Sequence, residues 1–239
     1  MFLDADKRTR EAVVHFWRTR AEQQKRQKSS GKTDQGSRSA VTGGAQMDGF
    51  MDLFSTVAIR AGIPETCVFR KKAVELPGFF RATKEWDLLV VRDRKLIAVI
   101  EAKSQVGPSF GNNFNNRTEE AIGSAADLWT AFRERAYMDS PAPFLGYFFL
   151  LEDCDASHRP VRVEEPHFKV FPEFVNASYM KRYELLCRKL VLERHYSTAA
   201  FITSTRTEGS AGSYREPAGD LSMDRFLRTL AGQIQAHVT

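Results

Sequence analysis

Two acids and a lysine flank an apolar stretch of the sequence, WDLLVVRDRKLIAVIEAK: Asp87, Glu101 and Lys103. Opposed Cβ atoms on neighbouring strands lie about 5 Å apart, and two carboxylates at that distance repel unless a proton or a cation lies between them. Mg²⁺ is typically held by one or two carboxylates together with waters and phosphate oxygens. Lys103 could orient or help to deprotonate a water, or hold a phosphate. The three residues therefore favour metal-assisted hydrolysis of a phosphodiester.

Two other interpretations of these residues stay open. Glu101 and Lys103 could form an ordinary salt bridge while Asp87 only ends a strand, because an acid-x-lysine triplet arises often by chance. A glycosidase could use a similar pair of carboxylates. The lysine beside the acids and the basic balance of the chain favour a phosphate substrate over a sugar.

The apolar segments around the acids predict a β-hairpin, in which directly opposite residues share a face. A three-residue connection at 93–95 pairs position 91 with 97, 89 with 99 and 87 with 101. A two-residue turn would send Glu101 to the other face, because a one-residue slip reverses the side chains. The three-residue register puts on one face the side chains of Leu89, Val91, Ile97, Val99, Asp87, Glu101 and Lys103.

The composition is that of an ordinary globular protein. The chain has 239 residues, enough for a substantial core, and its 35 basic against 30 acidic residues give a net charge of +5. This charge leans towards a polyanionic partner. Its three cysteines are scattered without metal-ligand spacing, which suits a reducing compartment. The charged N-terminus lacks the apolar core of a signal peptide, and no apolar run is long enough to span a membrane, so we expect a soluble intracellular protein.

Elements along the rest of the chain predict an α/β fold. We expect helices over 4–28, 45–60, 117–136 and about 173–195 and from about 221, and strands over 65–76, 143–153 and 198–204 besides the hairpin. The Ser- and Gly-rich segment 29–45 is predicted to be a mobile loop. The order helix, strand, strand, strand, helix, strand over about 46–152 indicates a mixed central β-sheet flanked by helices, within a single domain of residues 1–239.

The hairpin resembles the PD-(D/E)XK nuclease motif, with Asp87, Glu101 and Lys103 in the three motif positions and Trp86 where a proline often stands. A narrower resemblance, to the XhoI-like Type II restriction endonucleases, runs from about residue 10 to 207. It is carried, in the same order, by the segments GKTDQGSRSAVTGGAQMDGF, EAKSQVGPSFGNNFNNRTEEAIGSAADLWTAFRE, FPEFVNASYMKRYELLCRKLV and FITSTRT.

The resemblance implies a restriction-endonuclease-like core and a bacterial, cytoplasmic, Mg²⁺-dependent homodimer that cuts double-stranded DNA. The expected site is the palindrome 5′-CTCGAG-3′, cut after the first C, with a cognate methyltransferase protecting the host. Asp87, Glu101 and Lys103 would be catalytic, with Asp87 and Glu101 as metal ligands. Glu85, which the hairpin register pairs with Lys103, is a candidate third acidic group, although a surface charge explains it slightly better.

An Asn-rich segment after the hairpin predicts a loop beside the scissile phosphate. Asparagine can contact adenine and arginine can contact guanine, each with two hydrogen bonds, although asparagine also favours turns and caps. Asn116 is also a candidate cap for the next helix. The expected DNA-binding residues are Asn112, Asn113, Asn115, Asn116 and Arg117, joined by Gln35 and Arg38 of the 29–45 loop.

Two alternative functions remain. One is a nuclease of other specificity, such as a repair or junction-resolving enzyme. The other is a DNA-binding module on the same fold without chemistry. The intact set of Asp87, Glu101 and Lys103 favours a catalyst over a module.

Overall fold

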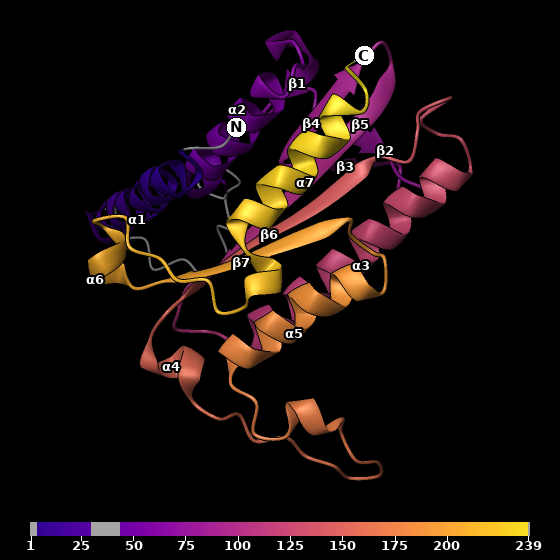
Figure 1. Ribbon diagram of the computed structural model, residues 1–239. Coiled ribbons are helices and arrows are strands. Elements are labelled where there is room, and N and C mark those ends of the chain that lie inside the picture. Colours follow the sequence, from indigo (N-terminus) through magenta and orange to yellow (C-terminus); the bar gives the residue numbers. More distant parts are fainter. Residues whose placement is uncertain (1–3, 30–43, 239) are drawn as a thin grey trace.

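The computed structural model describes residues 4–29 and 44–238, and its centre is a five-stranded mixed β-sheet (Figure 1). The strand order is β1-β4-β5-β6-β7, with the β1–β4 and β4–β5 pairs antiparallel and the β5–β6 and β6–β7 pairs parallel. The strands are β1 (Val68–Phe69), β4 (Leu88–Arg92), β5 (Lys95–Gln105), β6 (Phe144–Glu152) and β7 (Thr198–Ser204). A separate two-stranded sheet pairs β2 (Glu75–Pro77) with β3 (Thr83–Glu85). The prediction of a mixed α/β sheet is confirmed.

Helices cover both faces of the large sheet (Figure 1). One face packs against α1 (Ala5–Ser29), α2 (Asp48–Arg60) and α7 (Met223–Gln235), and the other against α3 (Gly111–Arg133) and α5 (Tyr179–Leu192). Shorter helical turns are η1 (Ala45–Met47), η2 (Glu65–Cys67), α4 (Asp155–His158), η3 (Pro172–Phe174), α6 (Arg206–Gly209) and η4 (Gly219–Leu221). In the described ranges, 4–29 and 44–238, we find no helix of the length and apolar character that crossing a membrane requires.

β6 shows why a continuous apolar run was a reliable strand signal. Every residue of β6 is buried, as expected for a strand covered on both faces. Phe148 packs towards α2, with its ring centroid 4.4 Å from that of Phe50. Phe149 packs the opposite way, 4.1 Å from Tyr183 of α5. Each face of the central strand thus belongs to a different half of the core.

The hairpin turn differs from the prediction, but the register at its open end does not. Arg92 pairs with Lys95 across a two-residue turn, in which Asp93 and Arg94 both have positive φ (52° and 61°). A β-bulge then restores the expected pairing of Leu89 with Val99. The extra bulged residue, Ile97, packs on the face covered by α2. The prediction that Ile97 shares a face with Leu89 and Val99 is therefore wrong.

The sequence predicted one strand over 65–76, and this prediction is wrong. It begins as η2, continues as the two-residue β1, and turns sharply before β2. Lys71 and Ala73 both have positive φ (63° and 54°), a conformation that ends pairing with β4. The chain therefore leaves the large sheet and returns through the separate β2–β3 hairpin.

The Asn-rich segment is also helical rather than a loop. Helix α3 begins at Gly111, six residues before the predicted start at 117. Phe110 and Phe114 pack on Tyr179 and Tyr183 of α5, with ring centroids 5.1 to 6.3 Å apart, and these contacts anchor the first turn. Asn116 lies inside the helix, so its predicted role as the cap is wrong.

Candidate active site

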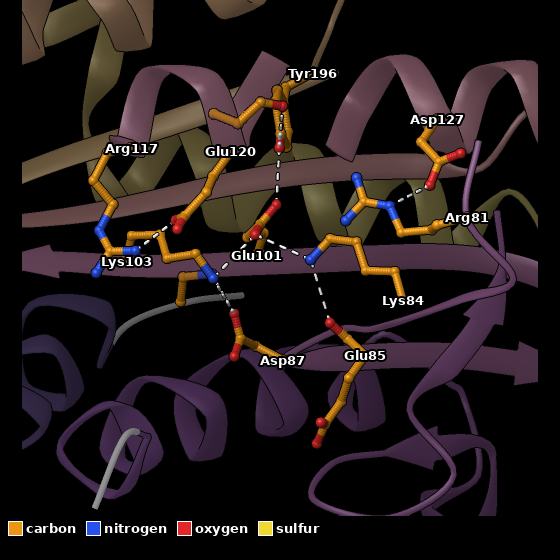
Figure 2. A network of polar contacts seen from close by, with 12 residues as sticks. Arg81, Lys84, Glu85, Asp87, Glu101, Lys103, Arg117, Glu120, Asp127 and Tyr196 are labelled. Atoms are coloured by element: carbon orange, nitrogen blue, oxygen red, sulfur yellow. Dashed lines mark hydrogen bonds and ion pairs between the residues drawn. The ribbon is translucent and has the colours of Figure 1, made fainter. Parts of the chain in front are cut away.

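The structure brings Asp87, Glu101 and Lys103 together at the open end of the β4–β5 hairpin (Figure 2). The Asp87 carboxylate accepts a hydrogen bond from the Ala102 amide at 2.8 Å, which ties the start of β4 to β5. The Lys103 ammonium lies 3.0 Å from Glu101 Oε1 and 3.9 Å from Asp87 Oδ2. The two carboxylates therefore share one lysine ammonium group, which the same-face register allows.

Glu101 is the most enclosed member of this cluster, with 2% of its side chain exposed. Its second oxygen, Oε2, accepts a hydrogen bond of 3.0 Å from the Tyr196 hydroxyl. Burial alone would raise the pKa of Glu101, but the charges of Lys103 and Lys84 outweigh it, so the pKa is lowered. Glu101 is therefore held as a carboxylate.

Lys84 is a second lysine on Glu101, and sequence reasoning missed it. Its ammonium lies 3.2 Å from Glu101 Oε1 and 4.2 Å from the centre of the Trp86 ring, and its side chain is only 13% exposed (Figure 2). The residue lies on β3, outside the large sheet, and reaches Glu101 from the β2–β3 hairpin. Its proximity to the Trp86-Asp87 pair was the available signal, but a surface lysine before a strand has the same appearance.

Glu85 does not lie where the prediction placed it. The register expected it opposite Lys103, but β4 starts at Leu88 and Glu85 pairs with Glu75 in the small sheet. The Glu85 carboxylate is turned away from Glu101, while its backbone carbonyl accepts a 3.3 Å hydrogen bond from Lys84 (Figure 2). In this structure Glu85 supports the site through its backbone.

Asp127 of α3 anchors the hairpin that carries Lys84. Its Oδ1 accepts hydrogen bonds from the amides of Phe79 and Phe80, both at 2.7 Å, and its Oδ2 lies 2.8 Å from Nε of Arg81. The Asp127 side chain is 3% exposed. Gly78 leaves the space for it, because a Cβ there would lie 2.3 Å from Asp127 Oδ2. The hairpin tip is thus fixed to α3 by one buried carboxylate.

Burial acts in opposite directions on the other two members of the cluster. It raises the pKa of Asp87, against the lowering effects of Lys103 and the Ala102 amide. It would lower the pKa of Lys103, but Glu101 and Asp87 outweigh it, so the pKa of Lys103 is raised. Lys103 is a charged donor in this arrangement. This favours its holding a phosphate or orienting a water over its accepting a proton.

The predicted DNA-binding residues of the Asn-rich segment lie on the first two turns of α3. Asn112, Asn115 and Asn116 are exposed, whereas Asn113 is half-buried and donates a 2.5 Å hydrogen bond to the Ser109 carbonyl. Arg117 is directed towards the cluster, near Lys103, where it pairs with Glu120 at 2.5 Å (Figure 2). The remaining two, in the predicted 29–45 loop, lie outside the described residues: Gln35 and Arg38.

The carboxylates present suit a hard divalent cation. Asp87 and Glu101 offer oxygen donors around the same lysine, and the desolvation of the half-buried Asp87 carboxylate is not fully compensated by its protein neighbours. In residues 4–29 and 44–238 we find no group of three or more His, Cys, Asp or Glu side chains that would form a closed metal cage. Mg²⁺ is commonly held by only one or two carboxylates, with waters and phosphate oxygens as its other ligands.

The large sheet follows the order of a helix, three strands, a crossover helix and a parallel strand. Two acids and a lysine meet at the open end of its β4–β5 hairpin. This combination defines the PD-(D/E)XK nuclease class. The family model described as restriction endonuclease XhoI matches residues 26–216. The chain belongs to this family of Type II restriction endonucleases, and it is a site-specific deoxyribonuclease.

Three characterised relatives support this assignment. The chain is 56% identical over 207 residues to the Type II restriction enzyme BstVI of Geobacillus stearothermophilus, covering 84% of this chain and 92% of the relative. It is 49% identical over 192 residues to the Type II restriction enzyme XhoI of Xanthomonas vasicola, covering 79% and 76%. It is 49% identical over 167 residues to the Type II restriction enzyme AbrI of Azospirillum brasilense, covering 70% and 75%. No solved structure matches the chain.

Proposed function

We propose that the chain cuts double-stranded DNA at 5′-CTCGAG-3′ after the first C, in a reaction that requires Mg²⁺. The observation that carries this proposal is the cluster of Asp87, Glu101 and Lys103 on one face of the hairpin, in a chain of the XhoI family. Digestion of a DNA of known sequence with Mg²⁺, followed by mapping of the cut ends, tests the site. Ends within another sequence would assign the chain a different specificity.

In this mechanism Asp87 and Glu101 would hold the cation. When bound, Mg²⁺ supplies positive charge to the phosphate oxygens on which negative charge develops. Lys103 contributes an ammonium beside both carboxylates, so it holds the scissile phosphate or orients the attacking water. Tyr196 and Lys84 fix the orientation of the Glu101 carboxylate from either side. The chain's own residues thus position the phosphodiester and keep Glu101 ionised.

Replacing Lys84 by Met should lower cleavage about ten- to hundredfold, because a buried carboxylate loses one charged hydrogen bond. Lys84 lowers the pKa of Glu101, so its removal raises that pKa. Less Glu101 is then ionised at acidic pH, and the acidic limb of the pH–rate profile should move to higher pH. The measurement is the cleavage rate against pH.

Lys84→Arg, which keeps the charge, should restore most of the activity and the position of the limb. Lys95→Met removes an exposed lysine at the far end of the hairpin and is the matched control. An acidic limb that stays in place in Lys84→Met would contradict the positioning role of this lysine.

The chain should act as a two-fold symmetric homodimer. One active site cuts one strand, and a palindrome presents two equivalent scissile phosphates related by the symmetry of an isologous dimer. Sedimentation of the protein with a cognate duplex in Ca²⁺ should show two chains per duplex. One chain per duplex would contradict the dimer.

The Asn side chains at the start of α3 should contribute to reading the site. Asn112, Asn115 and Asn116 are exposed, and we propose that at least one of them contacts a base edge. Loss of a good base contact should cost about 1–3 kcal/mol and relax discrimination at one position. The measurement is binding of each alanine variant to cognate and single-mismatch duplexes. Equal weakening on every sequence would show that the segment holds only the backbone.

Arg117 and Asn113 are expected to act differently from the exposed asparagines. Arg117 pairs with Glu120 beside Lys103, so its alanine variant should affect cleavage more than discrimination. Asn113 bonds the Ser109 carbonyl, and its loss should alter the segment that leads into α3. Gln35 and Arg38 remain proposed contacts to the target DNA.

A restriction enzyme of this specificity needs a cognate methyltransferase acting on the same sequence, because the host DNA carries the same sites. We propose such an enzyme as a functional partner in the cytoplasm of a bacterium, without a stable complex. Methylated CTCGAG duplexes should resist cleavage by this chain.

A further inference from the structure

A second basic site lies between α1 and α6, which are neighbours in Figure 1. A pocket of about 340 Å³ opens there. Its polar and aromatic lining consists of Trp17, Arg18, Arg20, Gln24, Arg206 and Ser210. Three arginine side chains thus line one hollow, outside the cluster around Glu101.

Arg20 forms no ion pair within 4 Å among the described residues, although the charge of Glu152 acts on it. Its Nε is buried and has no hydrogen-bond partner among the described residues. The neighbouring Glu152 already accepts two bonds from Arg206, through Nε and through Nη2 at 3.1 Å, and one of 2.8 Å from the Gly107 amide. Burial and the like charge of Arg206 lower the pKa of Arg20, and the charge of Glu152 offsets them only in part. A guanidinium in this position calls for an anion with several acceptor oxygens.

The walls of the pocket are held in place by the fold. The Trp17 indole donates a 3.0 Å hydrogen bond to Ser204 at the end of β7, and the Arg206 guanidinium lies 5.8 Å from the Trp17 ring. Gly209 allows α6 to approach the indole closely, since a Cβ there would lie 2.1 Å from Trp17 Nε1. The pocket is therefore a preformed site rather than a chance group of surface arginines.

The pocket opens at the same edge of the sheet as the catalytic cluster. Lys103 lies two residues before Gln105, the last residue of β5, and Gln105 pairs with Leu151 beside Glu152. Glu152 pairs in turn with Ser204, two residues before Arg206. Strands are about 4.8 Å apart, so two strand spacings separate β5 from β7 by about 10 Å. The catalytic side chains lie on the face covered by α3 and α5, and α1 covers the other face. A duplex with its scissile phosphate at Lys103 would therefore reach the pocket by crossing the ends of these strands.

We propose that this pocket binds a phosphodiester of the DNA backbone beside the cut site, with Arg20 as its main donor. The proposal rests on the proposed function in that it takes DNA as the ligand. A backbone phosphate carries no sequence information, so the pocket would contribute affinity and register rather than specificity.

The test is binding of the full-length chain in Ca²⁺ to a CTCGAG duplex and to an unrelated duplex of equal length, at several salt concentrations. Arg20→Gln should weaken binding to both duplexes about tenfold or more and reduce the slope of log affinity against log salt by about one. Arg94→Gln removes one positive charge from the hairpin turn, at the opposite end of β5. This control should leave the affinity for DNA and the salt slope unchanged. Melting curves check that the variants are folded.

Affinity and salt slope of Arg20→Gln equal to those of the parent chain would overturn the proposal. If DNA binding is unchanged in this way and inorganic phosphate raises the melting temperature of the parent more than that of the variant, the pocket binds free phosphate and the proposal is likewise overturned. The unrelated duplex separates this test from the proposed specificity, because loss of its binding does not depend on which sequence is cut.

Discussion

Asp87→Ala, Glu101→Ala and Lys103→Ala should each reduce cleavage about a thousandfold or more, while binding of the cognate duplex in Ca²⁺ stays largely intact. The reason is that, among the described residues, the hydrogen-bond and ion-pair partners of these side chains are one another, Lys84, Tyr196 and the Ala102 amide at the open end of the hairpin. Glu101 is the member that also contacts the core, through the hydroxyl of the buried Tyr196. Cleavage by gel assay and binding by anisotropy give the two readouts.

A matched control for this set is Asp93→Ala, which removes an exposed acid from the turn at the other end of the same hairpin. It should cleave at nearly the normal rate. Full cleavage activity in any one of the three cluster variants would remove that residue from the mechanism. Loss of binding in Ca²⁺ together with cleavage would show instead that the residue supports the DNA-binding surface.

Asp127→Ala should be the most destabilising single change near the site. It leaves two amides of the β2–β3 hairpin tip without their acceptor and removes the buried partner of Arg81. We expect a loss of about 3 kcal/mol and a melting temperature about 6–12 °C lower. Cleavage should fall as well, because the hairpin that presents Lys84 to Glu101 is no longer fixed to α3.

Arg81→Ala separates the two contributions of Asp127. It removes the ion pair, in which the arginine side chain is 46% exposed. The two hydrogen bonds from the backbone amides of Phe79 and Phe80 to Asp127 stay in place. It should therefore change stability by less than about 1 kcal/mol. Equal melting temperatures for Asp127→Ala and the parent chain would contradict the anchoring role of the buried carboxylate.

Helix α3 links most parts of the candidate site. Asp127 fixes the hairpin of Lys84, and Arg117 with Glu120 lies beside Lys103. The one proton of the Tyr196 hydroxyl is shared between Glu101 Oε2 at 3.0 Å and the Ala121 carbonyl of α3 at 3.1 Å. A single helix thereby sets the geometry around the buried carboxylate.

The sequence was sufficient to predict the hairpin face that carries the acids and the buried central strand. The first prediction rests on the alternation of apolar residues and the second on a continuous apolar run, and both depend on burial and not on exact turn geometry. The pairing of Leu89 with Val99 was correct even though the turn was not, because the bulge at Ile97 compensates for the shorter connection. A turn of Asp93 and Arg94 without glycine gives no sequence signal for two residues of positive φ.

Features fixed by distant contacts could not be predicted from local pattern. The Asn-rich segment was expected to be a loop, and asparagine favours turns and caps, but the packing of Phe110 and Phe114 on α5 folds it into α3. Lys84 reaches Glu101 only because Asp127, more than 40 residues further along the chain, holds the hairpin tip. No spacing in the sequence shows such a contact.

The most direct test of the account is a crystal structure of the chain with a CTCGAG duplex and Ca²⁺, which occupies the site without supporting cleavage. We predict one cation bound by both Asp87 and Glu101 at about 2.3–2.6 Å, with the phosphate after the first C beside it and within hydrogen-bonding distance of Lys103. A scissile phosphate bound away from the open end of the β4–β5 hairpin, or a cation that contacts neither carboxylate, would contradict the account.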